Sequence, residues 1–306
     1  MSYVYLLAGE NIELARADLR SFLRSQDLSD KIETKDRLAF SSSEASQLRR
    51  LALTHEVGRV IFRGRKEDFE PELPDGSFKV RAETLEDTDT DKEDLEREIG
   101  SMIESESTEV DLEDPEHTYR AFIFEDEIVV AERILDIDRS LFEERSNEKR
   151  PFSSPVSLDP VLARIMVNLS ELPPGEFIFD PFCGTGGILI EAGLCGIGVK
   201  GSDLSEEMVE GCRDNLEEYG IINHDIRALD VERSVREFED FEAIVTDLPY
   251  GKASTKENKP VKKFLDTLES FSGKTVFCYK EPELGDFESD YEIYVHKSLT
   301  RYIYVI

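Results

Sequence analysis

The feature that most constrains this chain is the glycine-rich stretch at residues 177–187, which reads FIFDPFCGTGG and precedes an apolar run at residues 188–194. The apolar residues 177–179 predict a short buried strand, and the glycines allow the backbone to turn tightly beneath a ligand. The apolar run predicts a helix packed behind that turn. A strand, a glycine loop and a helix in this order predict the first βα unit of a doubly wound nucleotide-binding sheet.

The charge of this loop indicates which nucleotide it would bind. Asp180 ends the predicted strand, so a carboxylate stands where a dinucleotide-binding loop admits pyrophosphate. A fixed negative charge disfavours phosphate and favours a cationic or amino-bearing ligand. S-adenosylmethionine has a ribose, an adenine and an amino acid tail but no phosphate. Asp203 follows Gly184 by about 20 residues, where an acid that binds the ribose is expected. A glycine-rich turn in another kind of α/β protein is the alternative.

A second group of residues ends the strand predicted at 242–247, with the sequence DLPYG at 247–251. In a doubly wound sheet this strand end faces the ligand crevice. The Asp247 carboxylate and the Leu248 carbonyl could each accept one N–H of an amino group conjugated to a base or an amide, which would aim the nitrogen lone pair at a methyl sulfonium. Pro249 would fix the backbone, and Tyr250 would stack on a flipped base. A plain turn is the alternative, because Asp, Pro and Gly are common turn residues.

The third strand of this sheet is expected to end near Asp230. Its carboxylate either accepts the adenine amino group or caps the next helix, and the sequence leaves both roles open. Taken together, these strand ends predict methyl transfer by one in-line displacement without a covalent enzyme intermediate. Positioning and preoriented acceptors would supply most of the acceleration.

Composition indicates the setting of this chemistry. The chain has 306 residues and is 39% hydrophobic, which is enough for two domains with cores of their own. It has no apolar run long enough to span a membrane and no recognisable signal peptide, so we expect a cytoplasmic protein without a membrane partner. The four cysteines are scattered, which favours reduced thiols and argues against a structural zinc site. We therefore expect no metal.

The net charge is −31, from 68 Asp and Glu against 37 Lys and Arg. Such a balance normally argues against a nucleic-acid partner, because contacts to phosphates dominate that kind of binding. Either the substrate is not a nucleic acid, or the protein works in a high-salt cytosol, where carboxylates keep the surface solvated and salt screens repulsion. Composition alone does not decide between the two.

Residues 1–134 predict an α+β domain. Asn11 is expected to cap an amphipathic helix, and a second helix is expected near residues 44–53. Farther on, an alternating strand places Lys79 and Arg81 on one face. No motif in this part of the chain carries chemistry.

Residues 135–157 are expected to form a linker, and residues 158–306 the α/β domain. Asp159 and Pro160 predict the start of a helix, as its cap and its first residue. The last two predicted strands, near residues 291–306, would form a closing hairpin.

These motifs resemble those of the archaeal THUMP-domain tRNA methyltransferases that modify N2 of the guanosine at position 10. The resemblance covers nearly the whole chain, and it is carried by residues 6–11, 53–57, 78–81, 150–152, 155, 158–169, 180–187 and 296–303. It implies an α+β N-terminal ferredoxin-like/THUMP domain. An α/β Rossmann-like class I methyltransferase domain would follow, with a seven-stranded sheet and a C-terminal β-hairpin.

The resemblance also implies roles for individual residues. S-adenosylmethionine would be bound by Asp180, Cys183, Gly184, Thr185, Gly186, Asp203 and Asp230. The guanine amine would be handled by Asp247, Leu248, Pro249 and Tyr250. The substrate tRNA would contact Lys79, Arg81, Arg150, Lys252 and Arg301. A small zinc-binding activator protein is a further implied partner of the methyltransferase domain.

Two features of the acceptor region remain open at this point. The family usually has Asp-Pro-Pro-Tyr, and this chain has Leu248 at the second position. Leu248 retains the carbonyl, but whether one or two methyl groups are added stays undecided. A cluster of lysines then follows Tyr250, and it is either an entry surface for RNA or a solvated loop: Lys252, Lys256, Lys259, Lys262 and Lys263.

Two other functions compete with tRNA methylation. A protein-glutamine N5 methyltransferase needs the same two acceptors, because its substrate is also an NH2 group with a delocalised lone pair. A tRNA-binding protein that has lost catalysis through Leu248 is the other. DNA adenine methylation fits the acceptor motif but not the N-terminal half. If tRNA is the substrate, adaptation to high salt is the better explanation of the acidic surface.

Overall fold

The computed structural model describes residues 2–70, 75–85, 91–125, 127–154, 157–249, 259–296 and 299–306, except for the side chain of His296. The chain forms two compact units. The first comprises residues 1–16, 28–48 and 54–138, and the second comprises residues 17–27, 49–53 and 139–306. Two short segments from the N-terminal part of the sequence therefore belong to the second unit. Among the described residues, no helix combines the length and the apolar character needed to cross a bilayer.

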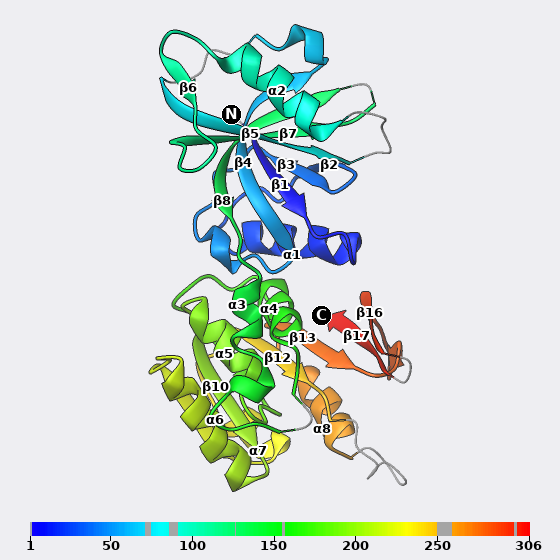
Figure 1. The fold of residues 1–306 in the computed structure, drawn as a ribbon. Helices are drawn as coiled ribbons and strands as arrows, with labels where there is room; N and C mark the ends of the chain where they lie inside the picture. Colours follow the sequence, from blue (N-terminus) through cyan, green and yellow to red (C-terminus); the bar gives the residue numbers. More distant parts are fainter. Residues whose placement is uncertain are drawn as a thin grey trace. The chain divides into compact units, whose positions relative to one another are not determined.

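The first unit is built on a mixed eight-stranded sheet with the order β2-β3-β1-β4-β8-β7-β5-β6 (Figure 1). Strand β5 runs parallel to both of its neighbours, β6 and β7, whereas the other pairs are antiparallel. The strands span Tyr3–Leu7 (β1), Glu33–Lys35 (β2), Leu38–Ser41 (β3), Thr54–Gly64 (β4), Gly76–Thr84 (β5), Thr108–Val110 (β6), His117–Ile123 (β7) and Ile128–Asp136 (β8).

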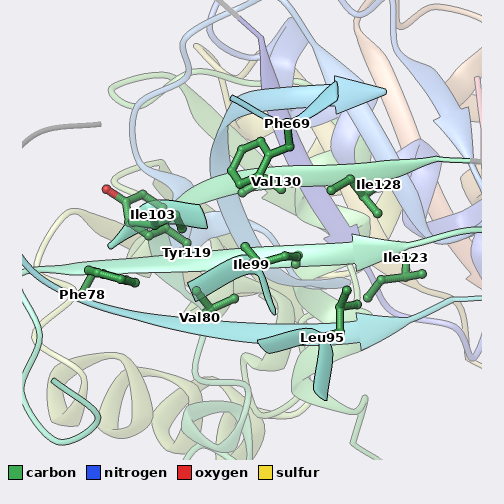
Figure 2. Packing of buried hydrophobic residues seen from close by; sticks show 11 residues of the cluster. Phe69, Phe78, Val80, Leu95, Ile99, Ile103, Tyr119, Ile123, Ile128 and Val130 are labelled. Carbon is green, nitrogen blue, oxygen red and sulfur yellow. The ribbon is translucent and has the colours of Figure 1, made fainter. Parts of the chain in front are cut away.

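Helix α2 (Lys92–Ile103) packs against β5 and closes one hydrophobic core of this unit. Leu95, Ile99 and Ile103 recur at helical spacing, so they share one side of α2. Figure 2 shows these side chains together with Phe78 of β5 and with apolar residues of the adjoining strands. This core accounts for the alternation of buried and less buried side chains in β5, because every second residue of that strand faces α2.

The second unit contains a seven-stranded sheet with the order β11-β10-β9-β12-β13-β17-β16. The first five strands are parallel, and the hairpin β16-β17 adds to β13 in the antiparallel direction. This confirms the predicted doubly wound sheet with a C-terminal hairpin. The strands span Phe177–Asp180 (β9), Gly198–Asp203 (β10), His224–Ala228 (β11), Ala243–Asp247 (β12), Lys274–Tyr279 (β13), Tyr291–His296 (β16) and Leu299–Val305 (β17).

Helices α4, α5 and α6 pack side by side, and α7 packs beside α8. The direction of strand addition reverses between β9 and β12, which is where such sheets bind ligands. The helices span Pro160–Leu169 (α4), Gly187–Leu194 (α5), Glu206–Glu218 (α6), Val231–Glu237 (α7) and Lys259–Leu268 (α8). The shorter elements are helix α3 (Ser140–Glu143) and a small hairpin of Glu283–Leu284 (β14) and Phe287–Glu288 (β15).

Local signals set several of these helix ends. The Asp159 side chain accepts the backbone N–H of Val161 at 2.9 Å, as its predicted role as the cap of α4 requires. The Ser205 hydroxyl caps α6 in the same way. Gly220, with a φ of +69°, follows α6 in the left-handed conformation that glycine adopts without strain.

Glu191 on α5 is fully buried and is neutralised by two arginines. Nη2 of Arg164, on α4, lies 2.7 Å from its Oε2, and Nε of Arg145 lies 2.7 Å from its Oε1. A buried carboxylate is tolerated only when charges and hydrogen bonds of this kind compensate its desolvation. These two ion pairs therefore anchor α4, and the segment that precedes α4, to helix α5, which follows the glycine loop.

The prediction of a helix at residues 44–53 is wrong, because the described chain there contains only a 3-10 turn at Leu48–Arg50. The backbone N–H groups of Ala52 and Leu53 donate to Oδ2 of Asp18 at 2.9 and 3.0 Å. Asp18 lies on helix α1 (Ile12–Arg24) and is fully buried. A carboxylate distant in sequence thus takes the donors that a local helix would use, and the amphipathic pattern of the segment does not reveal this.

The same carboxylate joins this segment to α4. Oδ1 of Asp18 accepts the side-chain amide of Asn168 at 2.7 Å, and Oδ1 of Asn168 accepts Nε of Arg50 at 2.7 Å. All three side chains are buried. Residues 17–27 and 49–53 are therefore held in the second unit by polar contacts rather than by apolar packing alone.

Replacing Asp18 with alanine should destabilise the protein by about 3 kcal/mol, because two backbone N–H groups and the Asn168 amide lose their acceptor inside the protein. Urea unfolding followed by circular dichroism measures this change. Asp214→Ala, at an exposed position of α6, is the matched control and should change the free energy of unfolding by less than about 0.5 kcal/mol. Equal stabilities of the two variants would contradict the assigned role of Asp18.

Candidate active site

A cavity of about 470 Å³ opens at the carboxyl ends of β9, β10 and β12. Its lining brings together residues that the sequence analysis placed at four separate positions along the chain. Four carboxylates and the glycine loop face this one space, together with the first two residues after β12. The predicted site residues that line it are Asp180, Cys183, Gly184, Thr185, Asp203, Asp230, Asp247, Leu248 and Pro249.

The glycine loop turns through two residues with positive φ. Gly184 has a φ of +50°, and no atom beyond its two chain neighbours lies within 4 Å of where its Cβ would stand, so the loop presents bare backbone to the cavity. Gly186 has a φ of +82°, and a Cβ there would lie 2.7 Å from Sγ of Cys212. Gly186 is absent from the cavity lining. Its role is to let the loop enter α5 against α6.

Polar contacts hold the rest of the loop in place. The N–H of Cys183 donates to the backbone oxygen of Ser202 at 2.9 Å, and Nδ2 of Asn215 donates to the backbone oxygen of Thr185 at 2.9 Å. Asn215 is fully buried on α6 and also binds both backbone groups of Phe152. Sequence reasoning did not single out Asn215, because an asparagine in the middle of a helix carries no motif.

Asp180 is the most deeply buried carboxylate of the site. Its Oδ1 accepts the hydroxyl of Thr246 at 2.6 Å and the backbone N–H of Phe182 at 3.0 Å. Burial, and to a smaller extent the nearby charges of Asp247 and Asp203, raise the pKa of Asp180 to about 7 against the lowering effect of the two hydrogen bonds. Asp180 is therefore a carboxyl group that titrates near neutral pH inside the cavity.

Asp203 and Asp230 end or follow the next two strands, as expected. Asp203 accepts the N–H of Gly184 at 3.2 Å through Oδ2 and the N–H of Ser205 at 2.9 Å through Oδ1. It therefore ties the glycine loop to the start of α6. Asp230 caps α7 through Oδ1, which receives the backbone N–H groups of residues 232 and 233. The helix-cap alternative for Asp230 is thus realised, and Asp230 lines the cavity as well.

Asp247 ends β12, and Leu248 follows it into the cavity wall. Oδ2 of Asp247 lies 2.9 Å from Nη1 of Arg301 on β17. The N–H of Leu248 donates to the backbone oxygen of Cys278 at 3.0 Å, and the Leu248 side chain is buried in the core beneath α8. Proline at this position could not donate that hydrogen bond, so leucine adds a backbone contact here. Tyr250 lies outside the described residues.

Part of the cavity wall is apolar. Leu204, directly after Asp203, keeps 73% of its surface exposed, and it lines the cavity with Leu229 and Val231. The sequence analysis did not assign these residues, although their positions next to the predicted strand-end acids are a usable signal. Lys259 and Lys263 of α8 line the same cavity, and they were predicted only as members of a lysine cluster.

The basic residues expected to contact RNA lie in different surroundings. Lys79 and Arg81 are half-buried on β5, and Nη1 of Arg81 lies 3.2 Å from Oε2 of Glu96. Arg301 is buried against Asp247, as described above. Lys252 lies outside the described residues.

Arg150 is buried as well and packs beneath the glycine loop. It donates to the backbone oxygen of Arg145 and to the hydroxyl of Ser157, each at 3.0 Å, and burial lowers its pKa. A Cβ on Gly187 would stand 3.1 Å from its guanidinium. Both guanidinium groups have partners inside the protein, and the RNA contacts expected of Arg150 and Arg301 stay predictions.

Within the part of the chain that the structure describes, no group of three or more His, Cys, Asp or Glu side chains is arranged to hold a metal ion. The four cysteines are all buried free thiols.

Comparisons with known proteins place both halves of the chain. The THUMP domain model matches residues 60–131, and the RMKL-like methyltransferase domain model matches residues 147–289. Among solved structures, TrmN from Thermus thermophilus is similar over 100% of this chain and 99% of its own, with a TM-score of 0.56 and 19% identity. SMU.472, solved as a complex with SAH, covers 100% of this chain and 97% of its own, with a TM-score of 0.51 and 16% identity. These two structures show a shared fold.

Full-length relatives carry the comparison further. The tRNA (guanine(10)-N2)-dimethyltransferase of Methanothermobacter thermautotrophicus is 38% identical over 100% of this chain and 99% of its own. The protein of the same name from Methanocaldococcus jannaschii is 31% identical over 98% of each chain. The chicken tRNA (guanine(10)-N(2))-methyltransferase TRMT11 is 27% identical over 71% of this chain and 54% of its own. The chain, a THUMP domain followed by a class I methyltransferase domain, therefore belongs to the archaeal tRNA (guanine(10)-N2)-dimethyltransferase family.

Proposed function

We propose that this protein transfers methyl groups from S-adenosylmethionine to the exocyclic N2 of a guanosine in tRNA, at position 10. The observation that carries the proposal is the shared cavity, in which Asp247 and Leu248 stand beside the glycine loop and three further carboxylates. Full-length similarity to tRNA (guanine(10)-N2)-dimethyltransferases supports the substrate and the position. Their names also support a second methyl addition, which yields N2,N2-dimethylguanosine.

The cavity suits a cationic nucleoside without phosphate. Its carboxylates favour the sulfonium and the ammonium of S-adenosylmethionine, and they disfavour a phosphate group at the same place. Asp203, which borders the glycine loop, would accept the ribose hydroxyls. Leu204, Leu229 and Val231 would enclose the adenine, which explains why Leu204 stands exposed at the cavity wall. Asp230 would accept the adenine amino group through the oxygen that does not cap α7.

The acceptor amine would be held by two oxygens at the end of β12. The Asp247 carboxylate and the Leu248 carbonyl would each accept one N–H of the guanine amino group, which turns the lone pair toward the methyl group. The methyl moves in one displacement, and the S–CH3 bond breaks as the N–CH3 bond forms. The methylated nitrogen then releases one proton, for which Asp247 is the neighbouring base. Alignment and fixed acceptors supply the acceleration.

Contacts to tRNA would come from both units. The THUMP domain would bind the tRNA body, with Lys79 and Arg81 on its sheet as candidate contacts. Lys259 and Lys263 of α8 line the cavity and would meet the phosphates next to the target guanosine, and the predicted Lys252 would add to them. Such contacts are ionic, so they weaken as salt rises.

The proposal extends to a location and to a partner. An enzyme that acts on tRNA would work in the cytoplasm. A small zinc-binding activator protein, implied by the family resemblance alone, would join the methyltransferase domain. Methyl transfer assayed with and without the cognate activator tests this part of the proposal.

Asp247→Ala should lower the rate of methyl transfer to unmodified tRNA by about 100- to 1,000-fold, because one of the two fixed acceptors is lost. The affinity for S-adenosylmethionine should stay within about threefold of that of the parent protein. Radiolabelled transfer, nucleoside analysis of the tRNA and calorimetric cofactor binding measure these quantities. Glu210→Ala, at an exposed position of α6, is the control. Loss of cofactor binding in Asp247→Ala would instead assign Asp247 to the cofactor site.

The nucleoside analysis also separates the competing functions. Labelled N2-methylguanosine or N2,N2-dimethylguanosine in tRNA supports the proposal, and digestion of the tRNA tests position 10. Label in a protein glutamine with none in tRNA would contradict it. Cofactor binding without any transfer, even with the activator added, would favour a protein that only binds tRNA.

Cofactor affinity should depend on pH through Asp180. In the unliganded protein its pKa is raised to about 7, so the carboxyl is protonated below that pH and ionised above it. A cationic ligand prefers the ionised form, and binding should therefore weaken as pH falls below about 7, by up to about tenfold per pH unit. Calorimetry between about pH 6 and pH 7.5 measures this change, and the cofactor's α-amino group, with a pKa of about 8, stays mostly protonated over that range.

Asp180→Asn is the matched variant for this measurement, because an asparagine oxygen can still accept the Thr246 hydroxyl. Its cofactor affinity should be lower at about pH 7.5 and nearly flat with pH. A variant that retained the pH dependence of the parent protein would show that another group is responsible.

A further inference from the structure

Arg301 of β17 lies against Asp247, and the sequence analysis had assigned it to RNA. We propose that Arg301 is a positioning residue for methyl transfer: it engages one carboxylate oxygen of Asp247, so that the carboxylate stays ionised and presents its other oxygen to the guanine amine. This inference rests on the proposed acceptor role of Asp247.

The contact crosses an intervening strand. In the sheet, β13 lies between β12 and β17. Asp247 is paired with Cys278 of β13, and Cys278 is paired with Ile303 of β17. Side chains paired across strands share a face of the sheet, and so do residues two apart along a strand. Asp247, Cys278, Ile303 and Arg301 therefore all lie on one face, and the arginine side chain reaches over Cys278.

The composition of the two faces agrees with this path. The opposite face of β13 and β17 carries Phe277, Tyr279 and Tyr304, which pack in the core beneath α8. A cysteine on the face of the ion pair is small enough to leave room for a long side chain. Burial raises the pKa of the Cys278 thiol above its usual range, so Cys278 is neutral beside the pair.

Burial gives this ion pair more weight than a surface pair has. The Arg301 and Asp247 side chains keep 8% and 18% of their surface exposed, and their N–O distance is 2.9 Å. Exposed pairs contribute little because water screens them. Removing one partner of a shielded pair leaves the other charge uncompensated, so the state of Asp247 depends on Arg301.

The groups around Asp247 explain why its carboxylate needs a neighbouring cation to stay ionised. The charged or titratable groups around it come from six elements, and three of these groups are carboxyl groups on the same cavity. They are Asp180 of β9, Asp203 of β10, Asp230 before α7, Cys278 of β13, Arg301 of β17, and Lys259 and Lys263 of α8. Without Arg301, the neighbouring carboxylates would favour protonation of Asp247, and a protonated carboxyl group is a poor acceptor for the amine.

The geometry also explains why the residue is arginine. A guanidinium is planar and always charged, and its N–H groups can bind a carboxylate at a fixed angle. A lysine would supply the charge as a mobile point without that orientation. A lysine at position 301 should therefore keep Asp247 ionised, but it should hold the Asp247 carboxylate less firmly in place.

The experiment compares Arg301→Gln and Arg301→Lys with the parent protein in methyl transfer to unmodified tRNA, across about pH 5.5 to 8.5. Arg301→Gln should lower kcat by about 10- to 100-fold, with the tRNA KM and the cofactor Kd within about twofold. The acid limb of its kcat profile should move up by about one pH unit, because an opposite charge beside Asp247 has been removed. Arg301→Lys should keep the parent acid limb with an intermediate kcat.

Two further variants make the outcome readable. Arg236→Gln, an exposed position of α7, controls for the loss of a positive charge and should match the parent protein. Asp247→Ala tests the acceptor role itself, because it removes both side-chain oxygens, and Arg301→Gln should cost little more activity in that background. Thermal unfolding and cofactor binding show whether each variant is folded. If Arg301→Gln does not fold, the kcat and pH profile of Arg301→Lys still test the inference.

The outcomes distinguish the acceptor role of Asp247 from the positioning role of Arg301. If Asp247→Ala retains the parent rate, the proposed acceptor role fails. If Asp247→Ala is inactive while Arg301→Gln keeps the parent kcat and pH profile, the acceptor role stands and the inference about Arg301 is overturned. A raised tRNA KM with an unchanged kcat in Arg301→Gln would also overturn it, and would return Arg301 to RNA binding.

Discussion

The hydrogen bond from the Thr246 hydroxyl to the Asp180 carboxylate joins the two strand ends on which the cavity is built. It is 2.6 Å long and buried, and it lies at the switch point between β9 and β12. The first strand leads into the glycine loop and the second into Asp247 and Leu248. A methyl transfer in one displacement depends on the alignment of donor and acceptor. A short buried contact between the elements that would hold each of them limits how far the two can shift apart.

Four carboxylates around one cavity would repel one another in a dry interior, and each is compensated differently. Asp180 has a pKa of about 7, so near neutrality it is partly protonated. Asp203 accepts N–H groups from the glycine loop and from the start of α6, and Asp230 accepts those at the start of α7. Asp247 is paired with Arg301. The site can thus offer negative charge to a cationic cofactor without strongly destabilising the folded protein.

Much of the second unit could be predicted because its signals are local. Buried strands read as short apolar runs, and caps such as Asp159 and Ser205 act within three residues of themselves. Gly186 is needed because of its positive φ, which a glycine-rich turn indicates directly. What the sequence did not reveal has the opposite cause, because it depends on contacts between distant residues. The absence of the helix expected at residues 44–53 depends on Asp18, and the burial of Arg150, which the sequence does not reveal, depends on partners such as Ser157.

The amino-acid sequence by itself determined the order of the elements, the doubly wound sheet, the glycine loop and the set of carboxylates at the strand ends. Short-range periodicity and turn chemistry are sufficient for these features. Only the tertiary structure decided which charge serves which partner. It directed Arg301 across β13 to Asp247, buried Asn215 against the glycine loop and brought residues 17–27 and 49–53 into the second unit. Such pairings join positions far apart in the chain, so they arise only when the sheet and its helices bring those positions together.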